Sequence, residues 1–548
     1  MQFQVSFSND PILRKALGFL QSNRFIEALD ACNEALAGAP KHAELHYLKG
    51  IIVSKSGNNV PAAEHLEQAI KLSPNNSQYY AVLGSVCVAA KRYIKAAAAY
   101  REAITRDPGN VNYIHELLNL LFLDGDLKAY LQVCEDAMKR FPDDPLLALS
   151  YKNVLPYDDR LSAVEQAPIH RSISARFLGG PPVPQPPRGQ AKSVLTIGYF
   201  APYLHVNFMR AFLKHHDPKK VKAIVYTNDL RICVCSDGAV RPLSANPMQN
   251  LEAIRRDGVD ILIDMVGPIP QMYGMYKIFS HRVAPIQLSW FATTATSGTS
   301  YIDGVLADEV IAPPEDQKLF TEKLLHLSQC YLPFSPHGYE PEVCVTPPAE
   351  KNGYITFGSA NKVLKCSDSN FALWRDLLKA VPESRLHWQE EAFSDPDTAE
   401  RWLARFEEGG IERKRLNFTA FVWHPQFYAF YDAIDISLDT TPYNGGITTF
   451  ESMWMGVPPV ILAGDRFISR TGKSMLKHFP QYKWVAETPE EYIAIAKKLA
   501  SDVPALARLR KELRPAVQAS PLCDGAAFAK TLEETFHKLW NEGAKAAA

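Results

Sequence analysis

Beyond residue 193 the chain alternates short apolar runs with longer stretches of helical periodicity. Three of the runs are VLTIGYF, VKAIVYTN and VDILIDMVG, at residues 194–200, 221–228 and 259–267. Such runs, rich in β-branched residues and bounded by turn formers, predict buried parallel strands. Residues 251–258, between the second and third runs, predict a crossover helix.

A second series of apolar runs follows an irregular, Pro-containing segment at 315–350. Its members are GYITFGSANK, SRLHWQ, RLNFTAF, DAIDISLDT and GVPPVILAG, at residues 353–362, 384–389, 415–421, 432–440 and 456–464. The whole pattern predicts two doubly wound α/β domains in tandem. Ligands of such domains bind at the carboxyl ends of the strands, but many functions use this fold.

The first quarter of the chain has a different pattern, a repeat with a period of 34 residues. Pro40, Pro74, Pro108 and Pro142 are 34 residues apart, and an Ala lies five residues before each of them. Small residues let the two helices of a unit approach closely, and Pro ends the second helix. This is the tetratricopeptide pattern, and a stack of such units presents a concave groove for a peptide or another protomer.

The domain boundaries follow from these two patterns. Helical segments are expected to continue past the repeats, and the stretch GGPPVPQPP predicts a stiff connector. We therefore expect about four repeats plus linking helices at 1–178 and a Pro-rich linker at 179–193. One Rossmann-like domain should follow at 194–350 and a second at 351–548.

Composition narrows the class of protein. Apolar residues make up 47% of the chain and the formal net charge is -1, which favours packed units and no nucleic-acid or membrane partner. The nine cysteines are scattered and odd in number, which indicates reduced thiols in a cytoplasmic protein. A secretion signal and a membrane-spanning apolar run are both missing from the pattern. We expect a cytoplasmic protein.

The most informative stretch is DISLDTTPYNGGITTFESMWMGVPPVIL at 435–462. Gly445 and Gly446 let the backbone approach a ligand, and the amides that open the next helix then point at it. Thr448–Thr449 add hydroxyl donors, and Glu451 lies where a carboxylate accepts two ribose hydroxyls. This unit suits a nucleotide diphosphate. An ordinary turn, with Thr as helix cap and Glu in the first turn, explains the residues equally well.

Four stretches resemble the O-GlcNAc transferase family and its plant relative, the SPINDLY-type protein O-fucosyltransferases. They are residues 281–308, 355–365, 435–458 and 520–540, which contain APIQ…TSG…D, FGSANKVLK, the glycine turn and SPLCDG. The resemblance covers nearly the whole chain. It implies an α-helical tetratricopeptide solenoid followed by a GT-B α/β module of two Rossmann-like domains. Residues 194–350 would then form the acceptor side and 351–548 the nucleotide-sugar side.

The resemblance also implies roles for individual residues on the donor side. Lys365 matches the family lysine that holds the donor diphosphate, and Lys362 matches a position near the same phosphates. A fixed cation with helix amides stabilises the charge of the leaving diphosphate. A lone lysine at a strand end is more often a solvated surface residue, so its motif carries the assignment. The remaining implied donor-binding residues are Asn361, Val422, His424, Phe427, Gly445, Gly446, Ile447, Thr448, Thr449 and Glu451.

The chain departs from the family at several of these positions. Phe427 would stack on the nucleobase where relatives commonly carry His, but a loop aromatic serves packing as often. Phe430 stands where many family members carry an Arg, so the sequence does not specify which nucleobase the donor carries. Ile447 removes one hydroxyl from the helix start.

The residues expected on the acceptor side differ from the family pattern more than those on the donor side do. His205 is the only candidate catalytic residue in the loop after the first strand, where a solitary His is more often structural or exposed. Thr296, Ser297 and Gly298 are expected to line the acceptor face. The NGYT segment of relatives is replaced by VGPIP, directly preceded by Met265 and Asp264.

The resemblance thus implies an inverting, metal-independent glycosyltransferase. It would move GlcNAc or a related sugar from a nucleotide diphosphate donor, taken as UDP-linked, to Ser or Thr of proteins recruited by the repeats. No cofactor is expected, and a homodimer is an option. The triplet Asp395-Pro-Asp397 reads as a turn and helix cap, so no metal ligands are expected. The alternative is a non-catalytic scaffold with a degenerate GT-B module, which the altered acceptor loops and Ile447 favour.

Overall fold

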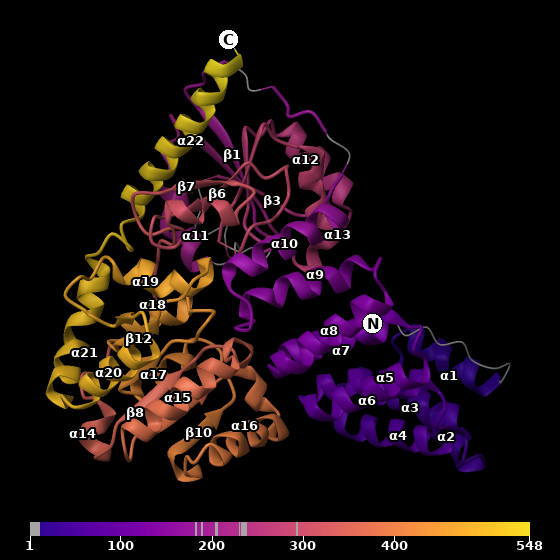
Figure 1. Ribbon diagram of the computed structural model, residues 1–548. Helices are drawn as coiled ribbons and strands as arrows, with labels where there is room; N and C mark the ends of the chain where they lie inside the picture. Colours follow the sequence, from indigo (N-terminus) through magenta and orange to yellow (C-terminus); the bar gives the residue numbers. More distant parts are fainter. Residues whose placement is uncertain are drawn as a thin grey trace. The chain divides into compact units, whose positions relative to one another are not determined.

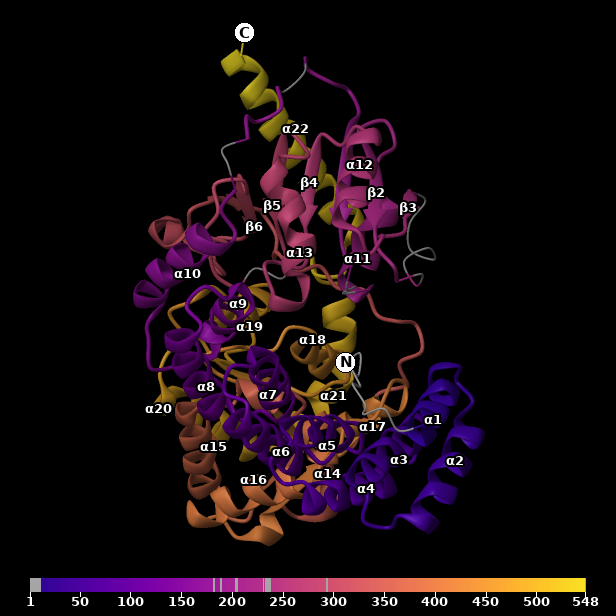
Figure 2. The same cartoon turned by 90° about the vertical axis from the view of Figure 1, so that its right-hand side faces the viewer.

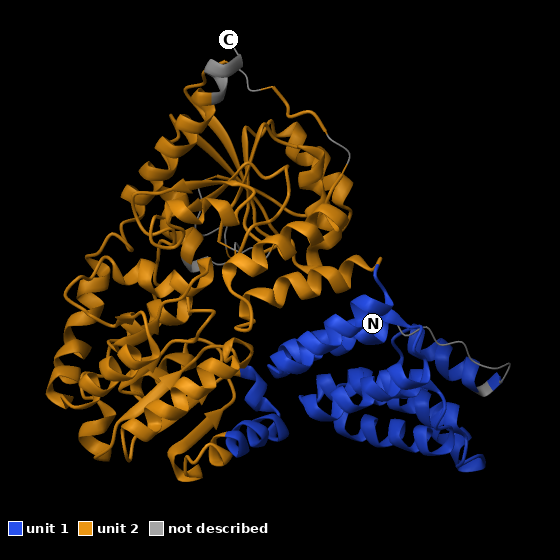
Figure 3. Cartoon of the chain, viewed as in Figure 1, with its two compact units in different colours: residues 1–142, 391–405 blue, residues 143–390, 406–548 orange. Residues whose placement is uncertain are grey.

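The computed structural model describes residues 11–180, 183–187, 190–202, 206–229, 231, 238–291 and 294–547. The chain divides into two compact units (Figure 3). The first comprises residues 1–142 and 391–405, and the second comprises 143–390 and 406–548. Among the described helices, none is long and apolar enough to cross a membrane.

The first unit is an array of paired helices (Figure 1). The helices are α1 (Pro11–Gln21), α2 (Phe25–Gly38), α3 (Ala43–Lys55), α4 (Asn59–Leu72), α5 (Ser77–Ala89), α6 (Tyr93–Arg106), α7 (Val111–Asp124) and α8 (Leu127–Arg140). Gly50 lies where α3 and α4 meet, because a Cβ there would come within 2.7 Å of the Leu66 Cγ atom. Gly84 has the same role against the Tyr100 ring, at 2.9 Å. The predicted tetratricopeptide array is confirmed.

Residues 391–405 join this array through a buried acidic group. The Asp395 carboxylate accepts hydrogen bonds from the Ile94 amide at the start of α6 and from the Asp397 amide, both at 3.1 Å. It therefore serves as a turn and cap residue, as the sequence indicates. The helix that follows, α16 (Pro396–Glu408), carries Arg401, whose guanidinium donates to the buried Asp124 carboxylate at 2.7 Å.

Helices α9 (Pro145–Val154) and α10 (Ala163–Phe177) belong to the second unit, whereas the sequence division placed them with the repeats. A helical pattern in the sequence indicates an apolar face, but it does not specify what that face packs against. They share a core with the first sheet that includes Ala148, Leu149, Ile173, Leu178, Phe200, Ile224 and Leu262. The Pro-rich stretch also lies inside the second unit and does not separate the two units.

The first sheet of the second unit has seven parallel strands in the order β3-β2-β1-β4-β5-β6-β7, most of them labelled in Figure 2. The strands are β1 (Leu195–Phe200), β2 (Val221–Tyr226), β3 (Ala239–Arg241), β4 (Ile261–Asp264), β5 (Ile286–Ser289), β6 (Gly304–Ala307) and β7 (Lys323–His326). Three helices accompany them: α11 (Val206–Phe212), α12 (Pro247–Arg256) and α13 (Tyr273–Tyr276). Strand β7 lies in the segment that the sequence predicted to be irregular, so that prediction was wrong there.

The second sheet has six parallel strands in the order β10-β9-β8-β11-β12-β13. The strands are β8 (Thr356–Ser359), β9 (Arg385–Gln389), β10 (Leu416–Thr419), β11 (Ile436–Leu438), β12 (Pro459–Leu462) and β13 (Val485–Ala486). Its helices, besides α16, are α14 (Pro348–Asn352), α15 (Asp368–Ala380), α17 (Ala429–Asp432), α18 (Ile447–Trp454), α19 (Thr471–Leu476), α20 (Pro489–Ala500) and α21 (Val503–Gln518). The strand order reverses between β8 and β11, the place where open α/β sheets bind ligands.

The last helix, α22 (Gly525–Ala547), returns to the first sheet (Figure 1). A Cβ on Gly525 would collide with the Ala211 carbonyl of α11, so α22 begins in direct contact with that helix. Further along, the buried Glu533 carboxylate lies 3.2 Å from His216 Nδ1. The sequence division assigned this segment to the second α/β domain, but its packing is with the first. The expected solenoid followed by two parallel-sheet domains is otherwise confirmed.

The core shared by α9, α10 and the first sheet predicts a difference between two truncations. A chain starting at residue 143 should remain folded, with some loss of solubility where residues 391–405 lose the repeats. A chain starting at residue 179 exposes the core of the first sheet and should lose cooperative unfolding. Gel filtration and thermal unfolding followed by circular dichroism test this. Equal behaviour of the two chains would contradict the division at residue 142.

Candidate active site

A buried carboxylate at the end of β11 organises the edge of the second sheet. Asp439 Oδ1 accepts hydrogen bonds from the amides of Thr440 (2.8 Å) and Gly445 (2.5 Å) and from the Asn361 amide group (3.3 Å). Its other oxygen accepts from the Thr449 hydroxyl at 3.4 Å. Burial raises the pKa of Asp439, and the amide of Gly445 opposes that shift. Asp439 therefore fixes the glycine turn and ties it to the loop after β8.

Lys365 lies in that loop, and its ammonium group is held in place by two neutral acceptors. Nζ donates to the Asn444 carbonyl at 2.9 Å and to Asn361 Oδ1 at 3.3 Å. It also lies 4.4 Å from the centre of the Tyr443 ring. Burial lowers the pKa of Lys365 to about 8, while the negative charge of Asp439 opposes the shift. An ammonium has three N–H groups, so the contacts above leave capacity for an anionic ligand.

Helix α18 begins directly beside this ammonium. Gly446 is its N-cap and supplies no side-chain cap, so the first amides of the helix are available to a ligand. A Cβ on Gly445 would lie 2.5 Å from Thr448 Oγ1 and 2.7 Å from Thr449 Oγ1, whereas one on Gly446 meets nothing within 4 Å. Of the two glycines, only Gly445 has no room for a larger side chain. Ile447 lies against the core beside the helix start.

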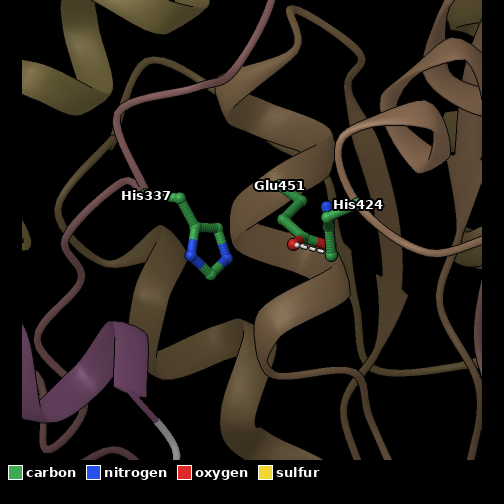
Figure 4. A group of neighbouring side chains, drawn as sticks. All are labelled: His337, His424 and Glu451. Carbon is green, nitrogen blue, oxygen red and sulfur yellow. Dashed lines mark ion pairs between the residues drawn. The ribbon is translucent and has the colours of Figure 1, made fainter. Parts of the chain in front are cut away.

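Glu451 lies one turn further along α18 and is buried (Figure 4). Its Oε2 accepts a hydrogen bond from Tyr431 at 3.5 Å, and its Oε1 lies 3.4 Å from His424 Nε2. Burial raises the pKa of Glu451 to about 8. Burial also lowers the pKa of His424 and brings that of His337 to about 4. His337, on the segment after β7, completes a group that the sequence analysis missed, because it lies 87 or more positions from both partners.

In the loop after β10, the exposed aromatic residue is Trp423 and not the predicted Phe427. Phe427 is only 2% exposed and packs among Phe421, His424 and Tyr431. This placement favours the packing role for Phe427. Trp423 is 80% exposed and is the ring that the loop presents, together with the partly exposed Val422. A tryptophan between the two candidate residues Val422 and His424 was the signal in the sequence that could have identified it.

The predicted acceptor residues are engaged in a buried network. Glu322 accepts hydrogen bonds from the Thr296 hydroxyl (2.7 Å) and from the amide (2.7 Å) and hydroxyl of Ser297. Lys152 of α9 donates to the Thr296 carbonyl at 3.1 Å. Gly298 has a φ of 70°, and a Cβ there would lie 2.9 Å from the His170 carbonyl of α10. Helices α9 and α10 therefore hold this loop.

A cavity nevertheless opens beside that loop at the carboxyl edge of the first sheet. Its lining includes Lys152, His170, residues 266–269, Ser289 and residues 294–297. Asp264 lies at the end of β4 next to this lining. One of its oxygens accepts from the amides of Val266 (3.0 Å) and Gly267 (2.9 Å), whereas Oδ2 is buried without a hydrogen-bond partner among the described residues. Burial raises the pKa of Asp264 to about 6.

His205, the predicted catalytic histidine, lies outside the described residues. Lys362 is described and its side chain is exposed next to Asn361. Asn361, Lys365 and Thr449 are thus gathered around the turn at Gly445. Glu451 lies further along α18 beside His424. Thr296, Ser297 and Gly298 belong to the network of Glu322.

Comparison with known proteins identifies the family. The profile of glycosyl transferase family 41 matches residues 244–335 and 349–532, which together make up half of the chain. The chain belongs to glycosyl transferase family 41. A tetratricopeptide repeat profile matches residues 55–111.

Relatives of this family 41 chain carry informative names. It is 33% identical over 368 residues to the probable UDP-N-acetylglucosamine–peptide N-acetylglucosaminyltransferase SPINDLY of Arabidopsis thaliana, covering 64% of this chain and 40% of that protein. It is 26% identical over 441 residues to the one named SEC from the same plant, covering 73% and 42%. The chain therefore spans about two fifths of the length of these relatives. A mutant O-GlcNAc transferase of Thermobaculum terrenum matches the structure with a TM-score of 0.79 at 27% identity, covering 93% of this chain and 99% of that one.

The two adjacent glycines give a matched pair of variants. Gly445→Ala should lower the free energy of unfolding by about 1–3 kcal/mol, because its Cβ has no room beside the two threonine hydroxyls. Gly446→Ala should change it by less than about 0.5 kcal/mol. Urea unfolding of both variants measures the difference. A larger loss for Gly446→Ala would show that the turn is not packed as described.

Asp264 predicts a pH-dependent stability. Its folded-state pKa of about 6 exceeds the ordinary value of 3.8, so the protonated acid favours folding. The contribution of Asp264 to stability should fall as pH rises from about 4 to about 6 and then level off. Asp264→Asn does not titrate, so its stability relative to wild type should gain roughly 3 kcal/mol across that interval. Urea unfolding of both proteins at several pH values measures this, and a constant difference would contradict the raised pKa.

Proposed function

We propose that this family 41 member is an inverting, metal-independent glycosyltransferase. It moves GlcNAc or a related sugar from a UDP-linked donor to Ser or Thr hydroxyls of proteins. The observation that carries the proposal is the convergence of the Lys365 ammonium with the uncapped start of α18 at the switch point of the second sheet. A cation and helix amides at one point form a seat for a diphosphate. The names of the relatives support a UDP-linked donor and a peptide acceptor.

The chemistry follows from the charge that develops on the leaving group. The acceptor hydroxyl attacks the anomeric carbon from the face opposite the diphosphate, the carbon–oxygen bond to the diphosphate breaks, and the configuration inverts. The hydroxyl proton passes to a base, for which His205 remains the candidate. Lys365 and the amides of residues 447–449 stabilise the departing diphosphate. An anion bound at Lys365 also favours its protonated form and so offsets the cost of burying the ammonium.

The nucleoside would lie beyond the diphosphate along α18. Glu451 is placed one turn from the helix start, where its free oxygen can accept the ribose hydroxyls in place of the His424 contact. The loop of Val422 and His424 would border the base. The exposed ring of Trp423 suits stacking on a base better than the enclosed ring of Phe427 does.

The remaining parts of the proposal concern partners and location. The tetratricopeptide array would recruit the acceptor proteins through its groove, with a homodimer as a further option. A cytoplasmic location is supported by the cysteines, because none of those in the described residues forms a disulfide.

Replacing Lys365 tests the diphosphate seat. Lys365→Ala removes the fixed cation, so the rate of sugar transfer should fall by on the order of a hundredfold or more. Lys379→Ala, on the exposed side of α15, is the matched control and should transfer normally. Release of free nucleotide from UDP-GlcNAc and related donors gives the rate. A Lys365→Ala protein as active as the control would refute the phosphate role, and a wild-type protein that releases no nucleotide from any donor would favour the scaffold alternative.

The chain that starts at residue 143 tests the role of the repeats. It retains every donor-side residue, so UDP binding by calorimetry should stay within about threefold of the full chain. Transfer to a whole-protein acceptor should fall by more than about tenfold, because groove contacts supply the acceptor affinity. Equal loss of donor binding and transfer would mean that the repeats help to build the donor site.

A further inference from the structure

Three potential metal ligands converge beside the nucleoside end of the donor site. His337 comes from the segment after β7, His424 from the loop after β10, and Glu451 from α18 (Figure 4). Figure 4 shows the three side chains pointing toward one another from these separate segments. One ligand atom from each lies within 4.8 Å of the other two. All three residues belong to the second unit.

The geometry suits a tetrahedral cation. Zinc binds imidazole nitrogen and carboxylate oxygen at about 2.0–2.1 Å, which places two tetrahedral ligand atoms about 3.3 Å apart. The His424 Nε2 to Glu451 Oε1 distance is 3.4 Å, already close to that separation. The two histidine rings lie 5.3 Å apart between centres, so a modest rotation of His337 completes three of the four corners. Two His and one Glu with an open fourth position is a donor set that zinc accepts.

Glu451 and His424 each have a polar atom that is poorly satisfied without such a ligand. Glu451 Oε1 and His424 Nδ1 are both buried and have no hydrogen-bond partner among the described residues. The contact between Oε1 and His424 Nε2 is close enough for an ion pair but does not have the geometry of a hydrogen bond. A buried carboxylate oxygen without a partner costs free energy, and a divalent cation would supply the missing interaction.

We propose that His337, His424 and Glu451 form a zinc site that the nucleotide sugar and the metal cannot occupy together. Zinc binding uses an oxygen of Glu451 and a nitrogen of His424. The proposed function assigns these two residues to the nucleoside, and the exclusion, though not the metal binding, rests on that assignment. Zinc is therefore an inhibitor that competes with the donor.

The position of Glu451 along α18 places this zinc site away from the diphosphate, where a catalytic metal would bind. Glu451 is four residues after the helix start at Ile447, a rise of about 6 Å. A cation held by Glu451 thus lies about one helical turn from the proposed diphosphate seat, where Lys365 already supplies positive charge. The metal occupies the nucleoside end and does not bridge the phosphates.

Zinc titration of the chelator-treated full-length protein tests the site. Calorimetry with zinc chloride should show one tight equivalent, and cobalt(II) should give the visible absorption of a four-coordinate ion. His337→Ala and His337→Asn should both weaken zinc binding by more than about tenfold. His281→Ala, at an exposed histidine of the same unit, should bind as wild type does. Unchanged affinity in both His337 variants overturns the proposal.

Competition with UDP tests the exclusion. Saturating UDP, with its own zinc affinity subtracted, should weaken zinc binding by more than about tenfold, and zinc should raise the apparent KM for the donor without lowering kcat. Simultaneous binding of UDP and zinc, or loss of UDP binding after chelation, overturns the exclusion. If zinc binds through His337 but the protein transfers no sugar under any condition, the proposed function fails while the metal site stands.

Discussion

The proposed donor site of this protein depends on one buried carboxylate. Asp439 receives hydrogen bonds from the backbone amides of Thr440 and Gly445, from Asn361 in the loop after β8 and from Thr449 on α18. A buried carboxylate with this many donors holds each of them in one position, because the loss of a donor would leave a buried negative charge poorly hydrogen-bonded. Asn361 in turn holds the ammonium of Lys365. The direction of the helix start and the position of the cation are therefore set together.

A second buried carboxylate has a comparable role at the other sheet. Glu322 binds the Thr296–Ser297 loop, while Lys152 and Ser174 from α9 and α10 bind the carbonyls of the same two residues. Burial lowers the pKa of Lys152 to about 7, and the charge of Glu322 opposes that shift. The two helices that follow the repeats are thus part of the scaffold of the first sheet. Their contribution is to fix a loop, and a cavity opens beside that loop.

Much of the fold was predictable from the amino-acid sequence. The repeats follow from a 34-residue period that only helix pairing explains, and β1, β2, β4 and β8 to β12 follow from their apolar runs, whereas β13 was not predicted. The glycine turn and Lys365 lie in contiguous motifs, and the role proposed for Lys365 comes from the family resemblance of its motif. Tertiary partners were not encoded locally. The sequences of helices α9, α10 and α22 predict helices but do not specify what those helices pack against, so their packing on the first sheet could not be deduced. His337 lies in an irregular segment, and only the fold brings it to Glu451.

The central claim is that Lys365 and the start of α18 bind the diphosphate of a nucleotide donor while Glu451 binds its ribose. A crystal structure of the chain with UDP tests this most directly. The account predicts β-phosphate oxygens within hydrogen-bond distance of Lys365 Nζ and of the amides of residues 447–449, with both ribose hydroxyls on the Glu451 carboxylate. A diphosphate bound elsewhere, with Lys365 still on Asn361 and Asn444 alone, would contradict it.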